Sequence, residues 1–249
     1  MITVSDLDAS ASFYGRYLDA AVVEESPEAV VLDVVTALLE LRLDRTAADT
    51  SWTESERTRG FRHIGFKVAD VDEMVRRLHA GGVTFRSRAQ EVTSAGVRIA
   101  FFFDPDGTLL EVVERHLAYV VVHDQSAVAL ERLMPVPERP RFDHIGHTVS
   151  DTARSVALYR DLDFAHLGSV PLDDADGFRI DFLRSGETVL ELFSYHSPTY
   201  RPVRHEITRG FTAAEIDGQC DDFPSVAALE TDRQVVLDPD GLPLVFSDN

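Results

Sequence analysis

The sequence repeats one short segment four times along its 249 residues. "HIGFKVADVDEMVRRL" starts at His63 and "HIGHTVSDTARSVALY" starts at His144, and the two align without a gap. "TVSDLDASASFY", from Thr3, matches "TVSDTARSVALY", from Thr148, and a weaker fourth copy, "GFTAAEIDG", starts near Gly210. Because each copy of a repeat folds into one supersecondary unit, this feature limits the fold more than any other.

Every copy predicts the same order of elements. A short strand ends at an aspartate (Asp6, Asp70 or Asp151) that can cap the first free N–H groups of a helix. The helix is amphipathic, and three β-rich runs follow it, the last two joined in the second and fourth copies by the turn "DPDG". We therefore expect an α+β chain of four βαβββ modules, at roughly 1–44, 59–116, 141–197 and 209–249.

The stretch between the second and third modules ends in "PVPERPRF", whose prolines predict a stiff linker. We expect a domain of two modules at 1–116, a linker at 117–140, and a second domain of two modules at 141–249, the last module being shortened.

Composition limits the partners. The net charge of −19 argues against nucleic acid and anionic membranes, since a face that binds phosphates needs clustered Lys and Arg. No apolar run reaches the length of a membrane span, and the N-terminus lacks the pattern of a signal peptide. The single cysteine, Cys220, suits a reducing compartment. We expect a cytoplasmic protein with a small-molecule ligand.

Two histidine–glutamate pairs recur at nearly the same spacing. Glu111 lies in the last strand of the module that starts at His63, and Glu191 lies in the last strand of the module that starts at His144. Each glutamate has apolar neighbours, and a buried carboxylate needs a metal, a cation or a proton. Either glutamate alone is as well explained as a solvent-facing residue of a strand edge, but the repeated spacing favours a shared role.

These four side chains suit a divalent metal. Two neutral imidazoles and two carboxylates balance its charge and fit Zn, Ni, Co, Mn or Fe(II). Strand alternation puts His144 and His147 on opposite faces. Since His147 aligns with the apolar Phe66, we predict that it is a packing residue. The predicted metal ligands are His63, Glu111, His144 and Glu191.

The "HIG..V.D" segment, the "DPDG" turn and the following "LLEVVE" strand resemble the vicinal oxygen chelate superfamily, which includes glyoxalase I, bleomycin-resistance proteins and extradiol dioxygenases. The resemblance covers nearly the whole chain. It implies that two βαβββ modules join their curved sheets into a cup. It also implies a divalent metal bound by one residue of the first strand and one of the fourth strand of each module.

The four modules are unequal in these ligands. The first has Glu40, but its first-strand position would precede Met1; the fourth has Phe211 and Val245 at the positions that match His63 and Glu111. Only a crossed arrangement, the second module with the third, collects four ligands in one cup, and we therefore expect this pairing and the convergence of His63, Glu111, His144 and Glu191. The first and fourth modules would then form a cup without a metal. Ligand loss is also compatible with two consecutive domains that bind no metal.

The resemblance implies lyase or isomerase chemistry, in which Glu111 or Glu191 moves a proton between neighbouring carbons of a substrate chelated through vicinal oxygens. Thr148 and Tyr195 replace the Arg and Asn with which glyoxalase I binds its thiol cofactor, so we do not expect a glutathione adduct. Two alternatives stay open: a metal-free protein that binds a small molecule or antibiotic, and an Fe(II) extradiol-type dioxygenase.

Overall fold

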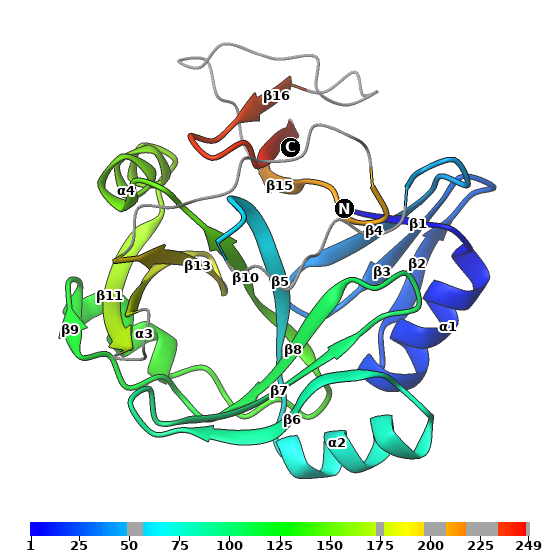
Figure 1. Ribbon diagram of the computed structural model, residues 1–249, viewed down its shortest axis with the longest axis horizontal. Helices are drawn as coiled ribbons and strands as arrows, with labels where there is room; N and C mark the ends of the chain where they lie inside the picture. Colours follow the sequence, from blue (N-terminus) through cyan, green and yellow to red (C-terminus); the bar gives the residue numbers. More distant parts are fainter. Residues whose placement is uncertain (49–56, 173–176, 197–207, 218–233, 248–249) are drawn as a thin grey trace.

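The computed structural model describes residues 1–48, 57–172, 177–196, 208–217 and 234–247 (Figure 1). Cys220 and the helix expected in the fourth module lie outside the described residues. No helix in the described ranges has the length and apolar composition required to span a membrane. The helices are α1 (Leu7–Leu18), α2 (Val71–Ala80), α3 (Gln125–Arg132) and α4 (Thr152–Asp161).

The central element is a curved, mixed sheet that joins the second and third modules (Figure 1). The second module supplies four neighbouring strands and the third module supplies the next four. In spatial order the strands are β6 (Phe85–Val92), β7 (Val97–Phe103), β8 (Leu109–Glu114), β5 (Gly60–Lys67), β10 (Arg141–Thr148), β13 (Thr188–Tyr195), β12 (Phe178–Ser185), β11 (Ala165–Leu172) and β9 (Val121–Val122).

The first and fourth modules form a second sheet system. Their contact is the antiparallel pair of β1 with β14, which corresponds to the pair of β5 with β10 in the central sheet. One sheet has the order β14 (Gly210–Phe211), β1 (Ile2–Val4), β4 (Leu38–Leu43), β3 (Ala29–Asp33) and β2 (Ala21–Glu25), and the other has β15 (Ala214–Asp217), β17 (Pro243–Ser247) and β16 (Gln234–Leu237). The strand pairing is therefore the crossed one.

The strand register corrects one alignment of the fourth module. Gly60 and Gly210 have φ angles of 100° and 103°, a region that favours glycine, and each lies opposite a threonine of its partner strand. Counted from these glycines, Ala213 corresponds to His63. The sequence alignment placed Phe211 there, which is wrong by two residues; the position still carries no metal ligand.

The predicted helix caps are present. The side chains of Asp6, Asp70 and Asp151 each accept a hydrogen bond from the backbone N–H three residues later, at the start of α1, α2 and α4. In α2, Met74 and Leu78 are buried, as the amphipathic pattern predicts. Figure 1 shows α1, α2 and α4 on the outer side of the sheets.

The two "DPDG" turns hold consecutive modules together. In the first half of the chain, Asp106 accepts hydrogen bonds from the backbone N–H and hydroxyl of Ser5, and Asp104 accepts one from the hydroxyl of Tyr14 at 2.9 Å. In the second half, Asp240 and Asp238 make the same contacts with Ser150 and Tyr159. The sequence predicted these segments only as turns, because their partners are more than 70 residues away.

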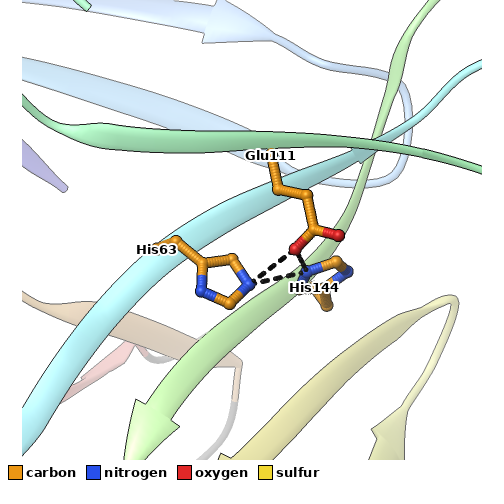
Figure 2. Close-up of side chains that lie close together, drawn as sticks. All are labelled: His63, Glu111 and His144. Carbon is orange, nitrogen blue, oxygen red and sulfur yellow. Dashed lines mark hydrogen bonds and ion pairs between the residues drawn. The ribbon is translucent and has the colours of Figure 1, made fainter. Parts of the chain in front are cut away.

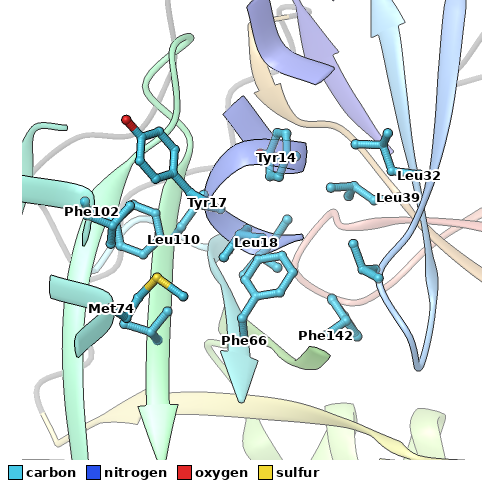
Figure 3. Packing of buried hydrophobic residues seen from close by; sticks show 14 of the residues in the cluster. Tyr14, Tyr17, Leu18, Leu32, Leu39, Phe66, Met74, Phe102, Leu110 and Phe142 are labelled. Atoms are coloured by element: carbon cyan, nitrogen blue, oxygen red, sulfur yellow. The ribbon is translucent and has the colours of Figure 1, made fainter. Parts of the chain in front are cut away.

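A hydrophobic core lies between α1, α2 and the back of the central sheet (Figure 3). Tyr14 and Leu18 of α1 meet Phe66, Phe102 and residues of the first module, all fully or almost fully buried. Burial of side chains of this size stabilises the fold by about 1.5–3 kcal/mol each. This packing fixes the back of β5, so that the side chains on its other face have a rigid support.

The segment predicted as a linker, 117–140, contains structure of its own. Within it lie β9, which extends the central sheet, and α3. Ala127 and Val128 of α3 pack with Val113, Leu167 and Phe182 of the central sheet. The connection therefore closes one side of the central sheet as well as joining the halves of the chain.

Candidate metal centre

His63 and His144 meet across the junction of the two modules (Figure 2). In the antiparallel pair of β5 and β10, His63 lies opposite Gly146 and His144 lies opposite Gly65. A Cβ atom on Gly65 would lie 2.0 Å from His144 Cε1, and one on Gly146 would lie 2.3 Å from His63 Cε1. The glycine of each "HIG" segment thus leaves the space that the histidine of the other module occupies.

Three ligand atoms converge at one point between these strands (Figure 2). Glu111 Oε2 lies 2.9 Å from His63 Nε2 and 3.2 Å from His144 Nε2, and the two nitrogen atoms are 3.1 Å apart. Glu191 Oε2 is 3.8 Å from both nitrogens. The structure therefore brings all four predicted ligands together, with Glu191 slightly farther out.

The four side chains are removed from solvent. His63, His144, Glu111 and Glu191 are 1, 2, 5 and 7% exposed. The rings of Phe101 and Phe193 lie edge-on to His63 at centroid distances of 5.3 and 5.8 Å. In such surroundings two carboxylates and two imidazoles require a compensating positive charge.

A β-bulge adds a carboxylate that orients His144. The register of β10 shifts between Phe142 and His144, so Asp143 lies beside the histidine and not on the opposite face. Asp143 Oδ2 is 3.1 Å from His144 Nδ1 and 3.3 Å from Lys67 Nζ. An N–H at Nδ1 that donates to Asp143 leaves the Nε2 lone pair free to bind a metal.

The protonation of the two glutamates differs. Burial alone raises the pKa of Glu111, but hydrogen bonds from His144 and His63 bring it down to about 2. Burial raises the pKa of Glu191 to about 7, and the negative charges of Glu111 and Asp143 add to this rise against the attraction of His144. Glu111 is thus held as an anion between the histidines, whereas Glu191 takes up a proton near neutral pH.

The pKa values of the two histidines are also shifted in opposite directions. Burial lowers the pKa of His63 to about 4, against the attraction of Glu111. Burial also disfavours the charged form of His144, but Glu191, Asp143 and Glu111 raise its pKa well above the usual value. A divalent cation would take the place of the proton that His144 otherwise needs.

The geometry fits a small divalent metal. Nitrogen and oxygen ligands bind zinc at about 2.0–2.2 Å, which places neighbouring ligand atoms roughly 3–3.5 Å apart. The three distances among His63, Glu111 and His144 agree with this spacing. The donor set of nitrogen and carboxylate oxygen suits zinc, nickel, cobalt, manganese and iron(II) alike.

The other residues singled out in the sequence lie elsewhere. His147 is buried on the opposite face, as predicted, but it contacts a polar partner, with Nε2 at 2.6 Å from Asp238 Oδ2. Glu40 lies in the other cup and pairs with Arg42 at 2.7 Å. Lys67 of β5 is buried and pairs with Asp143.

Sequence reasoning missed Asp143, Gly65 and Gly146. The two glycines had a detectable signal, since "HIG" recurs in both modules, but their role depends on the register between β5 and β10. Asp143 had no such signal, because the bulge that turns it into the site is not visible in strand alternation.

Comparison with known proteins identifies the family. Residues 1–112 and 141–229 match the Glyoxalase/Bleomycin resistance protein/Dioxygenase superfamily. The chain belongs to this superfamily. Both the predicted family and the predicted α+β, glyoxalase-like fold are therefore confirmed.

Glyoxalase I from Zea mays has the same fold over the whole chain. The V278E mutant of that enzyme superposes with a TM-score of 0.68 at 18% identity and covers 99% of this chain and 90% of its own. The unaltered maize enzyme gives a TM-score of 0.66 at 16% identity. At these identities the likeness concerns the fold alone.

Two proteins of Bacillus subtilis (strain 168) are related in sequence to parts of the chain. The uncharacterized protein YwkD is 42% identical over 57 residues, which make up 22% of this chain and 43% of YwkD. The uncharacterized protein YraH is 28% identical over 117 residues, 45% of this chain and 91% of YraH. The aligned segment thus spans less than half of YwkD, and both relatives are shorter than this chain.

Proposed function

We propose that the protein is a divalent-metal-dependent lyase or isomerase of the glyoxalase type, acting on a small, oxygen-rich substrate that chelates the metal through vicinal oxygens. The observation that carries the proposal is the convergence of two imidazoles and two carboxylates in one buried site. His63, Glu111 and His144 would hold the ion. Glu191 would either bind the ion as a fourth ligand or detach from it.

The chemistry follows from the donor set. A divalent ion with open positions acts as a Lewis acid on a carbonyl or enediolate. The anionic Glu111 lies between the two histidines and keeps their Nε2 atoms directed at one point. Asp143 fixes the orientation of the His144 ring, and Lys67 balances the charge of Asp143.

Glu191 is the better candidate for the base. Its carboxylate is less engaged than that of Glu111, since Oε2 is 3.8 Å from both histidines. Burial raises its pKa in the metal-free protein, whereas a bound cation favours its ionised form, so the carboxylate is available to accept a proton. In the proposed step, Glu191 accepts a proton from the carbon next to a substrate carbonyl and returns it to the neighbouring carbon.

The substrate need not carry glutathione. Tyr195, which stands where the family has an asparagine for the thiol cofactor, accepts a hydrogen bond from Arg62. The Arg62 guanidinium also lies 4.2 Å from the centroid of the Phe193 ring. The side chains around this position therefore already contact one another, and we favour a small substrate.

The test separates metal binding from proton transfer. Protein stripped with a chelator is reloaded with zinc, nickel, cobalt or manganese, and exchange of the carbon-bound proton of small α-hydroxycarbonyl compounds is followed by NMR in D₂O. Glu111→Gln should lower metal content and exchange together. Glu191→Gln should retain most of the metal and lose exchange, whereas Glu40→Gln, in the other cup, is the matched control.

Two outcomes would overturn the proposal. One is a protein that binds none of these ions, which would favour the metal-free binding protein. The other is full exchange activity in Glu191→Gln. Oxygen consumption with a catechol in the iron(II) form would instead point to the dioxygenase alternative.

A further inference from the structure

A second group of potential metal ligands lies at the β9 end of the central sheet. One nitrogen of His123, one nitrogen of His166 and one carboxylate oxygen of Asp181 all lie within 4.8 Å of one another. His123 directly follows β9, His166 lies in β11, and Asp181 lies in β12. The segment that follows β9 and the neighbouring strands β11 and β12 thus place metal-binding side chains together.

This group is separate from the site between the modules. Phe182 pairs with Glu191 across β12 and β13 and shares its face of the sheet. Asp181 precedes Phe182 in the strand and therefore points to the opposite face. That face also carries Leu183, which packs with Tyr159 of α4.

Asp181 carries an unfilled acceptor. The residue is 1% exposed. Its Oδ1 accepts hydrogen bonds from His166 Nε2 at 3.0 Å and Arg179 Nη2 at 2.7 Å. Its Oδ2 is buried and has no hydrogen-bond partner in the described part of the chain. A buried carboxylate oxygen without a partner is unfavourable, and a bound cation removes the penalty.

His123 supplies a ligand that can move. Its backbone N–H is fixed by a hydrogen bond to Leu167 O at 2.8 Å, while its side chain is exposed. Its ring stacks on His166 with centroids 4.1 Å apart at 30°. Two stacked imidazole rings cannot both direct a nitrogen lone pair at one ion. The His123 ring therefore has to rotate outward when a metal binds.

We propose that His123, His166 and Asp181 form a second, solvent-accessible site for a divalent late transition metal such as Zn²⁺ or Ni²⁺. Two imidazoles and a carboxylate form a donor set that these ions favour, and water completes the coordination. Arg179 stays on Oδ1, and the ion uses Oδ2. Because Asp124, the next residue after His123, caps α3, the bound ion ties the start of α3 to β11 and β12.

The test measures zinc binding by equilibrium dialysis with elemental analysis, and repeats it with Co²⁺, whose visible absorption reports the ligands. Wild type should bind two equivalents, of which the weaker belongs to this site. His123→Ala should lose the weaker equivalent, and Asp181→Asn, which keeps the shape of the side chain, should weaken it by at least about tenfold. The control His79→Ala removes an exposed histidine of α2 and should change nothing.

Combined variants separate this site from the proposed catalytic one. His63→Ala should lose the tighter equivalent and keep the weaker one, and His63→Ala with His123→Ala should bind none. If the catalytic proposal fails, His63→Ala binds as wild type while His123→Ala still loses its equivalent. Unchanged zinc and cobalt binding in both His123→Ala and Asp181→Asn, with thermal unfolding of the metal-free proteins like wild type, would overturn this inference.

Discussion

We expect the replacement His147→Ile to make the free energy of unfolding fall as pH rises between about pH 4.5 and 6.5, an interval in which the wild-type pair of Asp238 and His147 contributes a nearly constant stability. The first half of the chain offers a natural comparison, because its equivalent of Asp238, Asp104, has no histidine beside it. Asp104 and Asp238 open the two "DPDG" turns, are 5 and 4% exposed, and each accepts a tyrosine hydroxyl at about the same distance. Only Asp238 has a histidine beside it, because Ile2 stands at the position that corresponds to His147.

The pKa values of the two aspartates are accordingly shifted in opposite directions. Burial raises the pKa of Asp104 to about 6, despite hydrogen bonds from Thr108 and Tyr14. For Asp238 burial also raises the pKa, but the attraction of His147 outweighs it and the pKa is lowered. Burial lowers the pKa of His147, and Asp238 raises it above the usual value of 6.5.

The signs follow from linkage. In wild type, Asp238 contributes stability to the folded state above its unfolded-state pKa. This contribution is lost as pH falls through the lower pKa that Asp238 has in the folded protein. The contribution of His147 is present below pH 6.5 and lost as pH rises through its higher folded value. Between about pH 4.5 and 6.5 the pair therefore contributes a nearly constant stability.

In His147→Ile, Asp238 should behave like Asp104. A folded pKa of about 6 against 3.8 in the unfolded chain corresponds to about 3 kcal/mol of stability lost as pH rises through both values. About 2 kcal/mol of this falls between pH 4.5 and 6.5. The free energy of unfolding of His147→Ile should therefore decrease by this amount relative to wild type across that interval.

Urea unfolding at several pH values in this interval, followed by circular dichroism, measures the effect. His147→Ile with Asp238→Asn is the matched control, since it removes the titrating carboxyl and should restore the wild-type slope. A slope in His147→Ile that equals that of wild type would refute the reasoning, because it would mean that His147 does not set the charge of Asp238.

Three further outcomes are expected. Glu40→Gln should leave the metal content measured by elemental analysis unchanged, because Glu40 pairs with Arg42 and the matching positions of its cup carry Ala213 and Val245; loss of one equivalent would contradict this. Gly146→Ala should weaken zinc affinity in titration calorimetry by at least about tenfold, since the new Cβ displaces the His63 ring, and overpacking of this kind costs about 1–3 kcal/mol. Gly15→Ala, whose Cβ meets only ordinary contact, is its control, and equal affinities of the two variants would contradict the steric argument. Chelation of the metal should lower the melting temperature in calorimetry, because an ion that binds only the folded state stabilises it; an unchanged melting temperature would count against a buried metal.

Much of the site could be predicted from the sequence because it is repeated. The recurrence of His63 with Glu111 and of His144 with Glu191 indicated shared roles, and the helix caps followed from local hydrogen-bonding chemistry. Such features depend on residues that are neighbours in one strand, one turn or one module. The convergence of the four side chains was an expectation from matching module positions, and the strand pairing of β5 with β10 places the Nε2 atoms of His63 and His144 3.1 Å apart, each within 3.8 Å of a carboxylate oxygen of both glutamates.

The sequence alone determined the modules, the faces of their strands and the side chains that each module brings to a cup. Only the tertiary structure decided which modules share a cup, because alternation along a strand specifies a face and not the strand beside it. It likewise decided that Ala213, not Phe211, matches His63, and that Asp143 turns into the site through a bulge. These properties depend on register, and register is set by contacts between segments that are far apart along the chain.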